Sequence, residues 1–413
     1  MKHADFLIVG GSAAGTTAAE VIRSLEADSS IIVVTDEPHE EYSRVLLPQY
    51  VTHKVERENI FLKKADWYRE KLIELIKLTR VTKLSAKEHK VTLESGEEIQ
   101  YGKLLIAVGG FPLKLSVPGD DLENIHYLRT LEDADKFIES SKKGKKGVIV
   151  GGGLVSLDFA EGMRANGVEE VTILVREPYY WFGKLDRDSS RIIKSVLEKN
   201  GVAIAEGEEV DHFEGLGKVS KVVTKSQKSF DCDVVGVGIG IKSDFSWLEG
   251  SGIKIDRAIV TNEYLETSIE DIYAAGDCAQ FHDVIFEREH IMGNWANATS
   301  QGAAVAKTMV GQRTVFESAS FYSDTFFECK YSFIGVVDDN FADKIISRGS
   351  VESGKMTRIF IKTIGSVMII VGATVINNPA NVAPLTSIIK KKVDFSAYKE
   401  KFVDLSFDLN DIL

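Results

Sequence analysis

The sequence predicts an α/β fold in which a strand–glycine–helix unit occurs twice, ahead of a smaller α+β domain at the C-terminus. Residues 6–10 are an apolar strand that runs into the glycine-rich turn 10–15 and then a helix, and residues 147–153 repeat this order. Apolar runs without alternation are typical of strands buried on both faces of parallel sheets. From about Phe321 onward the chain changes to β-rich stretches, followed by a helical segment at 382–391.

Chain length and composition bound the domain organisation. The 413 residues exceed what one hydrophobic core usually serves. We predict a discontinuous first domain of residues 1–115 and 246–320, a second domain of residues 116–245, and a third of residues 321–413. The formal net charge of -12 argues against nucleic-acid binding, which needs a basic surface to displace counterions.

The cysteines and the apolar runs indicate where the chain resides. The three cysteines, Cys232, Cys278 and Cys329, have no CxxC spacing, so neither a disulfide framework nor a metal site is predicted. A reducing cytoplasm is the simplest location for such a chain. The apolar run from Val367 to Ile376 is too short to span a bilayer, and we expect no membrane span.

The first glycine-rich turn predicts a Rossmann-like dinucleotide site. Gly10 and Gly15 occupy the first and third glycine positions, and Ser12 replaces the second. A second strand at 31–35 ends in Asp36 and Glu37, where a carboxylate suits a ribose hydroxyl pair. We favour Asp36, with Glu37 also close. A later strand ends in Gly276-Asp277, and this second, distant anchor suits the extended FAD better than NAD.

The second glycine-rich turn predicts a nicotinamide dinucleotide site. Gly151, Gly153 and Ser156 stand at the fingerprint positions, between a strand and the helix that starts at Leu154. After the next strand, the position expected to carry an acid is followed by Arg176 and Glu177. Arginine there accommodates the 2′-phosphate of NADP, which favours NADPH, and Glu177 is close enough to permit NADH.

Five segments together resemble a known family: 10–15, 36–44, 105–109, 151–156 and 275–277. They are similar to the class I pyridine-nucleotide FAD oxidoreductases, in the branch that includes rubredoxin and ferredoxin reductases, the FAD part of assimilatory nitrite reductases, and apoptosis-inducing factor. The resemblance covers essentially the whole chain. It implies two glutathione-reductase-like dinucleotide domains, with FAD and NAD(P)H as cofactors.

The resemblance implies a set of cofactor-binding residues. For FAD these are Gly10, Ser12, Ala13, Ala14, Gly15, Asp36, Glu37, Arg44, Gln49, Val81, Ala107, Gly109, Arg129, Gly276, Asp277, Trp295 and Ala296. For NAD(P) they are Gly151, Gly153, Leu154, Val155, Arg176, Glu177 and Gly238. The helix that starts at Trp295 is expected to direct its N-terminus at the flavin, where its dipole stabilises negative charge.

One position departs from the family pattern. The family commonly has a lysine at the position of Gln49, paired with an acid at the position of Asp158, and both residues are expected near the flavin and nicotinamide. With glutamine there, we expect a hydrogen bond in place of an ion pair if the two side chains still meet. Asp158 would then lack a cationic neighbour, which would raise its pKa or weaken the positioning of the nicotinamide.

The absence of one cysteine narrows the activity. Disulfide reductases of this fold carry a cysteine after the second strand, but residues 42–48 contain none. We therefore expect hydride transfer from NAD(P)H through flavin N5, then electron transfer to a rubredoxin- or ferredoxin-type carrier or to an iron–sulfur partner subunit. The alternatives are an NAD(P)H oxidase that reduces dioxygen and a slow-turnover, cofactor-bound signalling protein like apoptosis-inducing factor. The direction of electron flow stays open, and a homodimer is possible.

Overall fold

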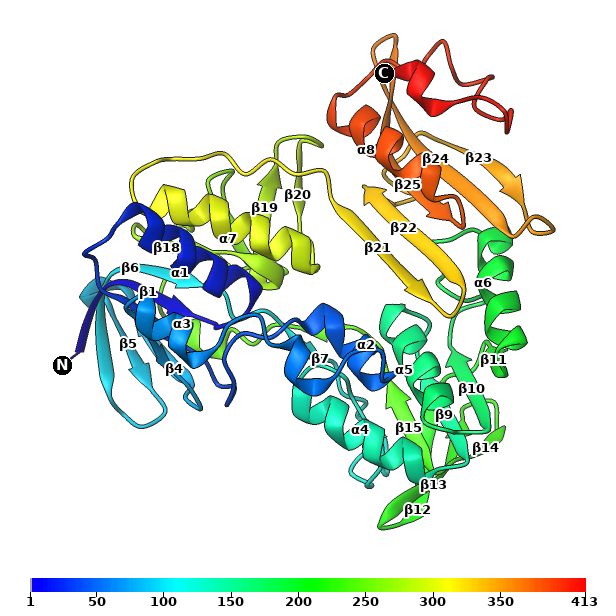
Figure 1. Ribbon diagram of the computed structural model, residues 1–413, viewed down its shortest axis with the longest axis horizontal. Helices are drawn as coiled ribbons and strands as arrows, with labels where there is room; N and C mark the ends of the chain where they lie inside the picture. The colour runs from blue at the N-terminus through cyan, green and yellow to red at the C-terminus, as the bar shows by residue number, and fades with distance from the viewer. Residues whose placement is uncertain (1) are drawn as a thin grey trace. The chain divides into compact units, whose positions relative to one another are not determined.

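The computed structural model describes residues 2–413, and its contacts divide the chain into two units. Unit 1 contains the chain up to Val45 together with Arg57–Phe111 and Lys242–Ser318. Unit 2 contains Leu46–Glu56, Pro112–Ile241 and Ala319–Leu413. The boundaries of the three predicted domains stay a prediction. Figure 1 labels many of the helices and strands of both units.

Unit 1 is built on a parallel sheet whose strands end side by side. Its parallel strands, in order, are β3 (Ile73–Ile76), β2 (Ile31–Val34), β1 (Lys2–Val9), β6 (Glu98–Ile106) and β18 (Ile272–Ala274). Val9 at the end of β1 is in register with Val34 on one side and Ile106 on the other. The carboxyl ends of three strands therefore meet where the first glycine-rich turn begins.

The remaining elements of unit 1 extend or cover this sheet. Helix α1 packs against α7, and both contribute alanines and aliphatic side chains to the core over β1 and β2. The bounds of these elements are α1 (Ala13–Leu25), α3 (Ala65–Glu70), α7 (Trp295–Met309), β4 (Val81–Ser85), β5 (Lys90–Leu93), β17 (Ile259–Thr261), β19 (Ala279–Asp283) and β20 (Arg288–His290). Strands β4 and β5 are antiparallel and continue the sheet from β6.

Unit 2 repeats the parallel strand–turn–helix arrangement. Its parallel sheet has the order β11 (Val202–Glu206), β10 (Glu170–Val175), β9 (Lys146–Val150), β15 (Val234–Val237) and β8 (Ile125–His126). The helices of this part are α2 (Leu47–Val51), α4 (Leu131–Lys143), α5 (Leu154–Ala165) and α6 (Arg187–Lys199). An antiparallel group, β12 (Val210–Leu216), β13 (Lys218–Thr224) and β14 (Ser229–Asp231), follows β11.

The C-terminal part of unit 2 is an antiparallel sheet with a helix on it. The strand order is β21 (Phe321–Phe326), β22 (Cys329–Gly335), β25 (Val367–Ile376), β24 (Lys355–Ile364) and β23 (Lys344–Ser350). Helix α8 (Val382–Lys390) packs on β25 and β22. The predicted fold class, two strand–glycine–helix units and a C-terminal α+β part, is confirmed. Within residues 2–413, every helix is too short or too polar to cross a bilayer.

Candidate functional site

The first glycine-rich turn joins β1 to α1 through two very close backbone contacts. Gly10 has φ +118°, and a Cβ there would lie 2.1 Å from the carbonyl oxygen of Ala107. A Cβ at Gly15 would lie 1.8 Å from the carbonyl oxygen of Gly10. Ser12 is the N-cap of α1, and its side chain accepts no capping hydrogen bond among the described residues. The first N–H groups of α1 are thus available to an anion at this turn.

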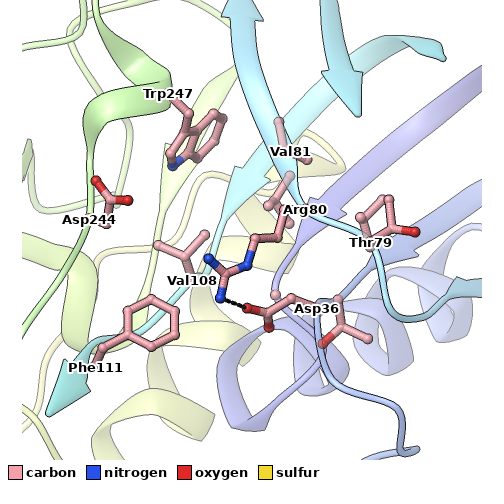
Figure 2. A pocket seen from close by; sticks show the side chains of 12 residues that line it. Asp36, Thr79, Arg80, Val81, Val108, Phe111, Asp244 and Trp247 are labelled. Atoms are coloured by element: carbon pink, nitrogen blue, oxygen red, sulfur yellow. Dashed lines mark ion pairs between the residues drawn. The ribbon is translucent and has the colours of Figure 1, made fainter. Parts of the chain in front are cut away.

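A pocket lies beside this turn, at the carboxyl ends of β1 and β2 (Figure 2). Asp36 and Arg80 form an ion pair across it, with 3.1 Å between Oδ2 and Nη2. Arg80 also lies over the ring of Phe111, at 5.8 Å from the ring centroid. Val81 and Trp247 complete an apolar wall. This lining would suit a nucleotide whose flat base lies against the apolar side chains and whose ribose binds the carboxylate.

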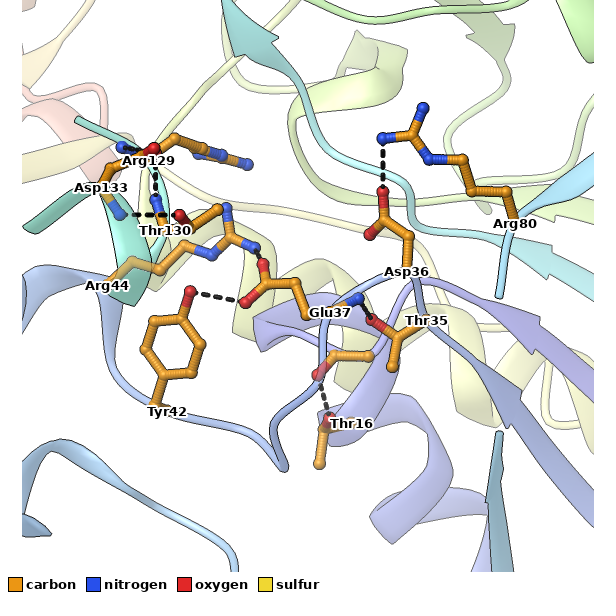
Figure 3. Close-up of polar contacts among 11 residues, drawn as sticks. Thr16, Thr35, Asp36, Glu37, Tyr42, Arg44, Arg80, Arg129, Thr130 and Asp133 are labelled. Atoms are coloured by element: carbon orange, nitrogen blue, oxygen red, sulfur yellow. Dashed lines mark hydrogen bonds and ion pairs between the residues drawn. The ribbon is translucent and has the colours of Figure 1, made fainter. Parts of the chain in front are cut away.

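The two candidate acids after β2 have different surroundings. Asp36 lines the pocket, whereas Glu37 accepts a hydrogen bond of 2.6 Å from the hydroxyl of Tyr42 and forms an ion pair with Arg44 (Figure 3). Glu37 therefore orders the 37–44 segment. Arg44, which the sequence predicts at the flavin, already has this carboxylate as its partner.

The segment after β18 approaches the same turn. Gly276 has φ +82°, and a Cβ there would lie 3.4 Å from that of Ala14. The N–H of Gly276 donates to Oε1 of Gln301 at 2.7 Å, and Gln301 is fully buried. Its other amide atom, Nε2, has no hydrogen-bond partner within residues 2–413. A buried amide donor beside Gly276-Asp277 is a group that a bound polar ligand would satisfy.

Gln301 is a site residue that the sequence analysis missed. The available signal was a glutamine among small and apolar residues in the helix predicted to start at Trp295. The structure does start α7 at Trp295, with Asn294 as its N-cap accepting from Asn297 N–H at 2.8 Å. Trp295 is partly buried against the core, and Ala296 is exposed.

The second glycine-rich turn lies in unit 2 and has the same local geometry as the first. Gly151 has the same φ as Gly10, +118°, and a Cβ there would lie 2.2 Å from the carbonyl oxygen of Gly238. Gly153 is the N-cap of α5, and Ser156 donates from its hydroxyl to the carbonyl of Gly151 at 2.8 Å. The predicted residues Gly151, Gly153 and Gly238 therefore lie together, with the N-terminus of α5 beside them.

The residues after β10 are not arranged as a free cationic site. Nη2 of Arg176 lies 2.8 Å from Oε1 of Glu177, and the exposed fractions of the two side chains are 68% and 34%. The hydrogen bond that Arg176 donates to Glu177 and the charge of Glu177, with a contribution from Glu209, raise the pKa of Arg176. The arginine charge that would receive a 2′-phosphate is thus already compensated by neighbouring carboxylates.

Gln49 and Asp158 both belong to unit 2, but no hydrogen bond joins them among the described residues. Gln49 is exposed on α2, while Asp158 is half-buried on α5. The roles predicted for Gln49 and Asp158 near the flavin and nicotinamide stay a prediction. The short α2 helix leaves the Gln49 side chain in solvent, and the next cation, Lys54, pairs instead with Glu161 at 2.8 Å.

Asp158 lies in an acidic and aromatic environment. Burial raises its pKa to about 8, and the charges of Asp324 and Glu161 add to that shift. Tyr322 donates from its hydroxyl to Asp324 at 3.0 Å, and burial raises the pKa of Tyr322 as well. The carboxyl of Asp158 is thus expected to hold its proton at neutral pH.

Arg129 directly precedes the N-cap of α4. Its backbone N–H donates to Asp133 at 3.1 Å, and Thr130 and Asp133 form a capping box (Figure 3). The local sequence Arg129-Thr130 thus positions the start of a helix in unit 2.

The model of the pyridine nucleotide-disulphide oxidoreductases matches residues 4–302. The chain belongs to this family. The predicted resemblance is confirmed, and so is the predicted class, an oxidoreductase.

Several relatives are reductases of small electron carriers. The chain is 29% identical to the NADH-rubredoxin oxidoreductase of Clostridium acetobutylicum, over 88% of this chain and 86% of that one. The reductase in a covalent putidaredoxin reductase–putidaredoxin complex superposes with a TM-score of 0.92 at 26% identity, over 100% of this chain and 98% of that one. A ferredoxin reductase from Rhodopseudomonas palustris gives a TM-score of 0.90 at 25% identity, over 98% and 99%.

Other relatives are much longer proteins. The chain is 30% identical to a nitrite reductase [NAD(P)H] of Bacillus subtilis, over 76% of this chain and 38% of that protein. It spans 40% of an assimilatory nitrate reductase electron transfer subunit from the same organism. The family thus includes both stand-alone reductases and parts of larger proteins.

Proposed function

We propose that this chain is an FAD-dependent NADH reductase that passes electrons to a separate protein carrier. The carrier would be a rubredoxin- or ferredoxin-type protein, or an iron–sulfur partner subunit. The main support for the proposal is that the glycine turn occurs twice. Gly10 and Gly151 share φ +118°, and each lies in close contact with the carbonyl of a residue that follows a neighbouring strand. Two such turns in one chain suit two dinucleotides.

FAD is the dinucleotide that fits unit 1. When bound, it supplies the chemistry that takes up two electrons together and releases them singly. The glycine turn and α1 would bind its pyrophosphate, Asp36 would bind the adenosine ribose, and Gln301 and Gly276-Asp277 would hold the more distant part. The buried, unpartnered Nε2 of Gln301 supports this fit, because it is a donor that the protein alone leaves unsatisfied.

NADH fits the second turn better than NADPH. The sequence favours NADPH through Arg176, but the guanidinium is bound by Glu177 at 2.8 Å. A 2′-phosphate would have to compete with this carboxylate and would meet the charge of Glu209 as well. A 2′-hydroxyl could instead donate to Glu177. The role of unit 2 would be to bind and orient the nicotinamide dinucleotide.

The cysteines support a carrier rather than a disulfide as the acceptor. All three are buried and unpaired within the described chain, and burial raises the pKa of Cys278 to about 11 and those of Cys232 and Cys329 to about 12. A thiol of such high pKa is a poor nucleophile at neutral pH. The three unpaired thiols also support the proposed cytoplasmic location.

The test is a comparison of electron acceptors with the purified, FAD-loaded protein. Anaerobic stopped-flow mixing with NADH should bleach the flavin within seconds, and reoxidation by a rubredoxin or a [2Fe–2S] ferredoxin should be faster than reoxidation by dioxygen. Hydrogen peroxide formed at the full turnover rate would instead identify an oxidase. Flavin reduction slower than minutes at millimolar NADH would contradict the reductase and favour a cofactor-bound signalling protein.

A further inference from the structure

The loop between β10 and α6 contains an aromatic residue with a strained backbone conformation. Trp181 is buried and has φ +62°. A bulky side chain rarely adopts the left-handed region, and it does so only where the surroundings enforce it. We define residues 176–186 as the Trp181 loop.

The C-terminal sheet supplies these surroundings. The Trp181 ring meets Tyr331 and Phe333 of β22 edge-on, with centroids 5.2 and 5.0 Å away. Lys184, also in the loop, donates from Nζ to the carbonyl of Val337 at 3.1 Å. The middle of the Trp181 loop is therefore packed against and hydrogen-bonded to the C-terminal sheet.

A buried arginine of the same sheet holds the end of the loop. Arg358 on β24 is 3% exposed, and its Nε lies 3.2 Å from Oδ2 of Asp186. It also donates from Nη1 to the carbonyl of Lys184 at 3.4 Å, and Nη2 lies 3.5 Å from Asp339. Asp186 is in turn the N-cap of α6. A buried guanidinium with these partners ties the loop to β24 in one geometry.

The loop reaches the second glycine turn through Tyr180. This side chain is fully buried, and its hydroxyl donates to the carbonyl oxygen of Gly153 at 2.7 Å. A trans peptide is planar, so a fixed Gly153 carbonyl directs the N–H of Leu154 to the opposite side. That N–H is one of the free donors at the start of α5, where a pyrophosphate would bind.

We propose that Tyr180 and Arg358 are positioning residues for the nicotinamide dinucleotide. The C-terminal sheet, acting through the Trp181 loop, sets the orientation of the Gly153–Leu154 peptide at the pyrophosphate. The inference rests on the proposed function only in that a dinucleotide binds at the second glycine turn. It does not depend on which acceptor takes the electrons.

The first experiment removes a single hydrogen bond. Tyr180→Phe keeps the buried ring and loses only the donor to Gly153. The KM for NADH and the Kd for NAD⁺ by calorimetry should rise roughly fivefold to tenfold, the effect of losing one hydrogen bond. The kcat at saturating NADH and the FAD content should stay unchanged. An unchanged Kd for NAD⁺ in this variant would overturn the proposal.

The second experiment compares two buried arginines of one sheet. Arg358→Met releases the loop, whereas Arg348→Met is the matched control. Arg348 lies on β23, is 6% exposed, and binds Asn381 and the carbonyl of Phe407 rather than the loop. We expect weaker NAD⁺ binding in Arg358→Met, recovery in Arg358→Lys, and wild-type binding in Arg348→Met.

The outcomes separate the inference from the proposed function. Equal weakening of NAD⁺ binding in both arginine variants would show that general loosening is the cause and would overturn the proposal. If the Arg358→Met variant does not fold, the Kd of Tyr180→Phe for NAD⁺ tests the proposal by itself. NAD⁺ binding is measured without turnover. The effect of Tyr180→Phe on NAD⁺ binding can therefore be observed even if the protein reduces no carrier, and it can be absent even if the protein does reduce one.

Discussion

Neighbouring acids differ in their partners at both dinucleotide turns. Asp36 lines a pocket with Arg80, whereas the adjacent Glu37 is engaged by Tyr42 and Arg44. After the second turn, Glu177 is engaged by Arg176. Asp36 also has a cationic partner, Arg80, so what distinguishes it from Glu37 is its place in the lining of a pocket.

Coenzyme preference is testable at the Arg176–Glu177 pair. Glu177→Gln should release Arg176 to meet a 2′-phosphate, so the ratio of kcat/KM for NADPH to that for NADH should rise roughly threefold to tenfold. Steady-state kinetics with both coenzymes would measure it. Arg176→Met is the control, because it removes the cation and should not gain NADPH activity. A tenfold wild-type preference for NADPH would contradict the proposed role of Glu177.

Asp158 should make stability depend on pH. Its pKa is raised from 3.8 to about 8, so the folded protein binds this proton more tightly than the unfolded chain. The resulting stabilisation is complete below pH 4 and is lost as the pH rises towards 8. Asp158→Asn should therefore be more stable than the wild type at pH 9, by on the order of a few kcal/mol, and similar to it near pH 4.

Urea unfolding from pH 4 to pH 9 would measure this effect. Asp324→Asn is the companion variant: removal of one neighbouring charge should move the Asp158 transition to lower pH without abolishing it. Identical pH profiles for the wild type and Asp158→Asn would show that Asp158 is ionised throughout.

At the scale of the element, the contact between α1 and α7 positions the first turn. A Cβ at Gly302 of α7 would lie 2.4 Å from the carbonyl oxygen of Ala14 on α1. The absence of a side chain lets the two helices approach this closely. Because α1 begins at the glycine turn, the distance between the helices also determines where its first N–H groups lie.

Gly302→Val should separate the two helices. We expect a loss of about 1–3 kcal/mol from overpacking, together with a lower FAD content after purification. The absorbance ratio of flavin to protein and thermal unfolding would measure both effects. Ala303→Val, on the adjacent and only partly buried position of α7, is the control and should retain FAD. Full FAD content in Gly302→Val would contradict the role of this contact.

At the scale of the whole molecule, each unit supplies one complete glycine turn of its own. The turn at Gly10 lies in the parallel sheet of unit 1, and the turn at Gly151 lies in that of unit 2. Unit 2 also contains the antiparallel C-terminal sheet, whose side chains contact the loop after β10. The C-terminal sheet is thus joined by specific contacts to the loop that follows β10 of the parallel sheet in unit 2.

Local patterns determined the fold class and both glycine turns. Gly10 and Gly151 directly follow apolar strands and have φ +118°, and a Cβ at Gly15 would lie 1.8 Å from the nearby carbonyl oxygen of Gly10. Such constraints can be seen in the sequence, because only glycine tolerates φ +118° or so close a backbone approach. The missing cysteine in 42–48 is likewise evident from the sequence alone.

The tertiary structure decided which side chains are engaged. Gln301 with Gly276, Arg358 with Asp186 and Lys54 with Glu161 join residues that are far apart in the chain. No local pattern encodes these pairs, because they depend on how helices and sheets pack. For the same reason the sequence could not decide whether Gln49 and Asp158 meet. Thus the sequence by itself determined that two strand–glycine–helix turns exist, and packing determined which polar groups are left for a ligand.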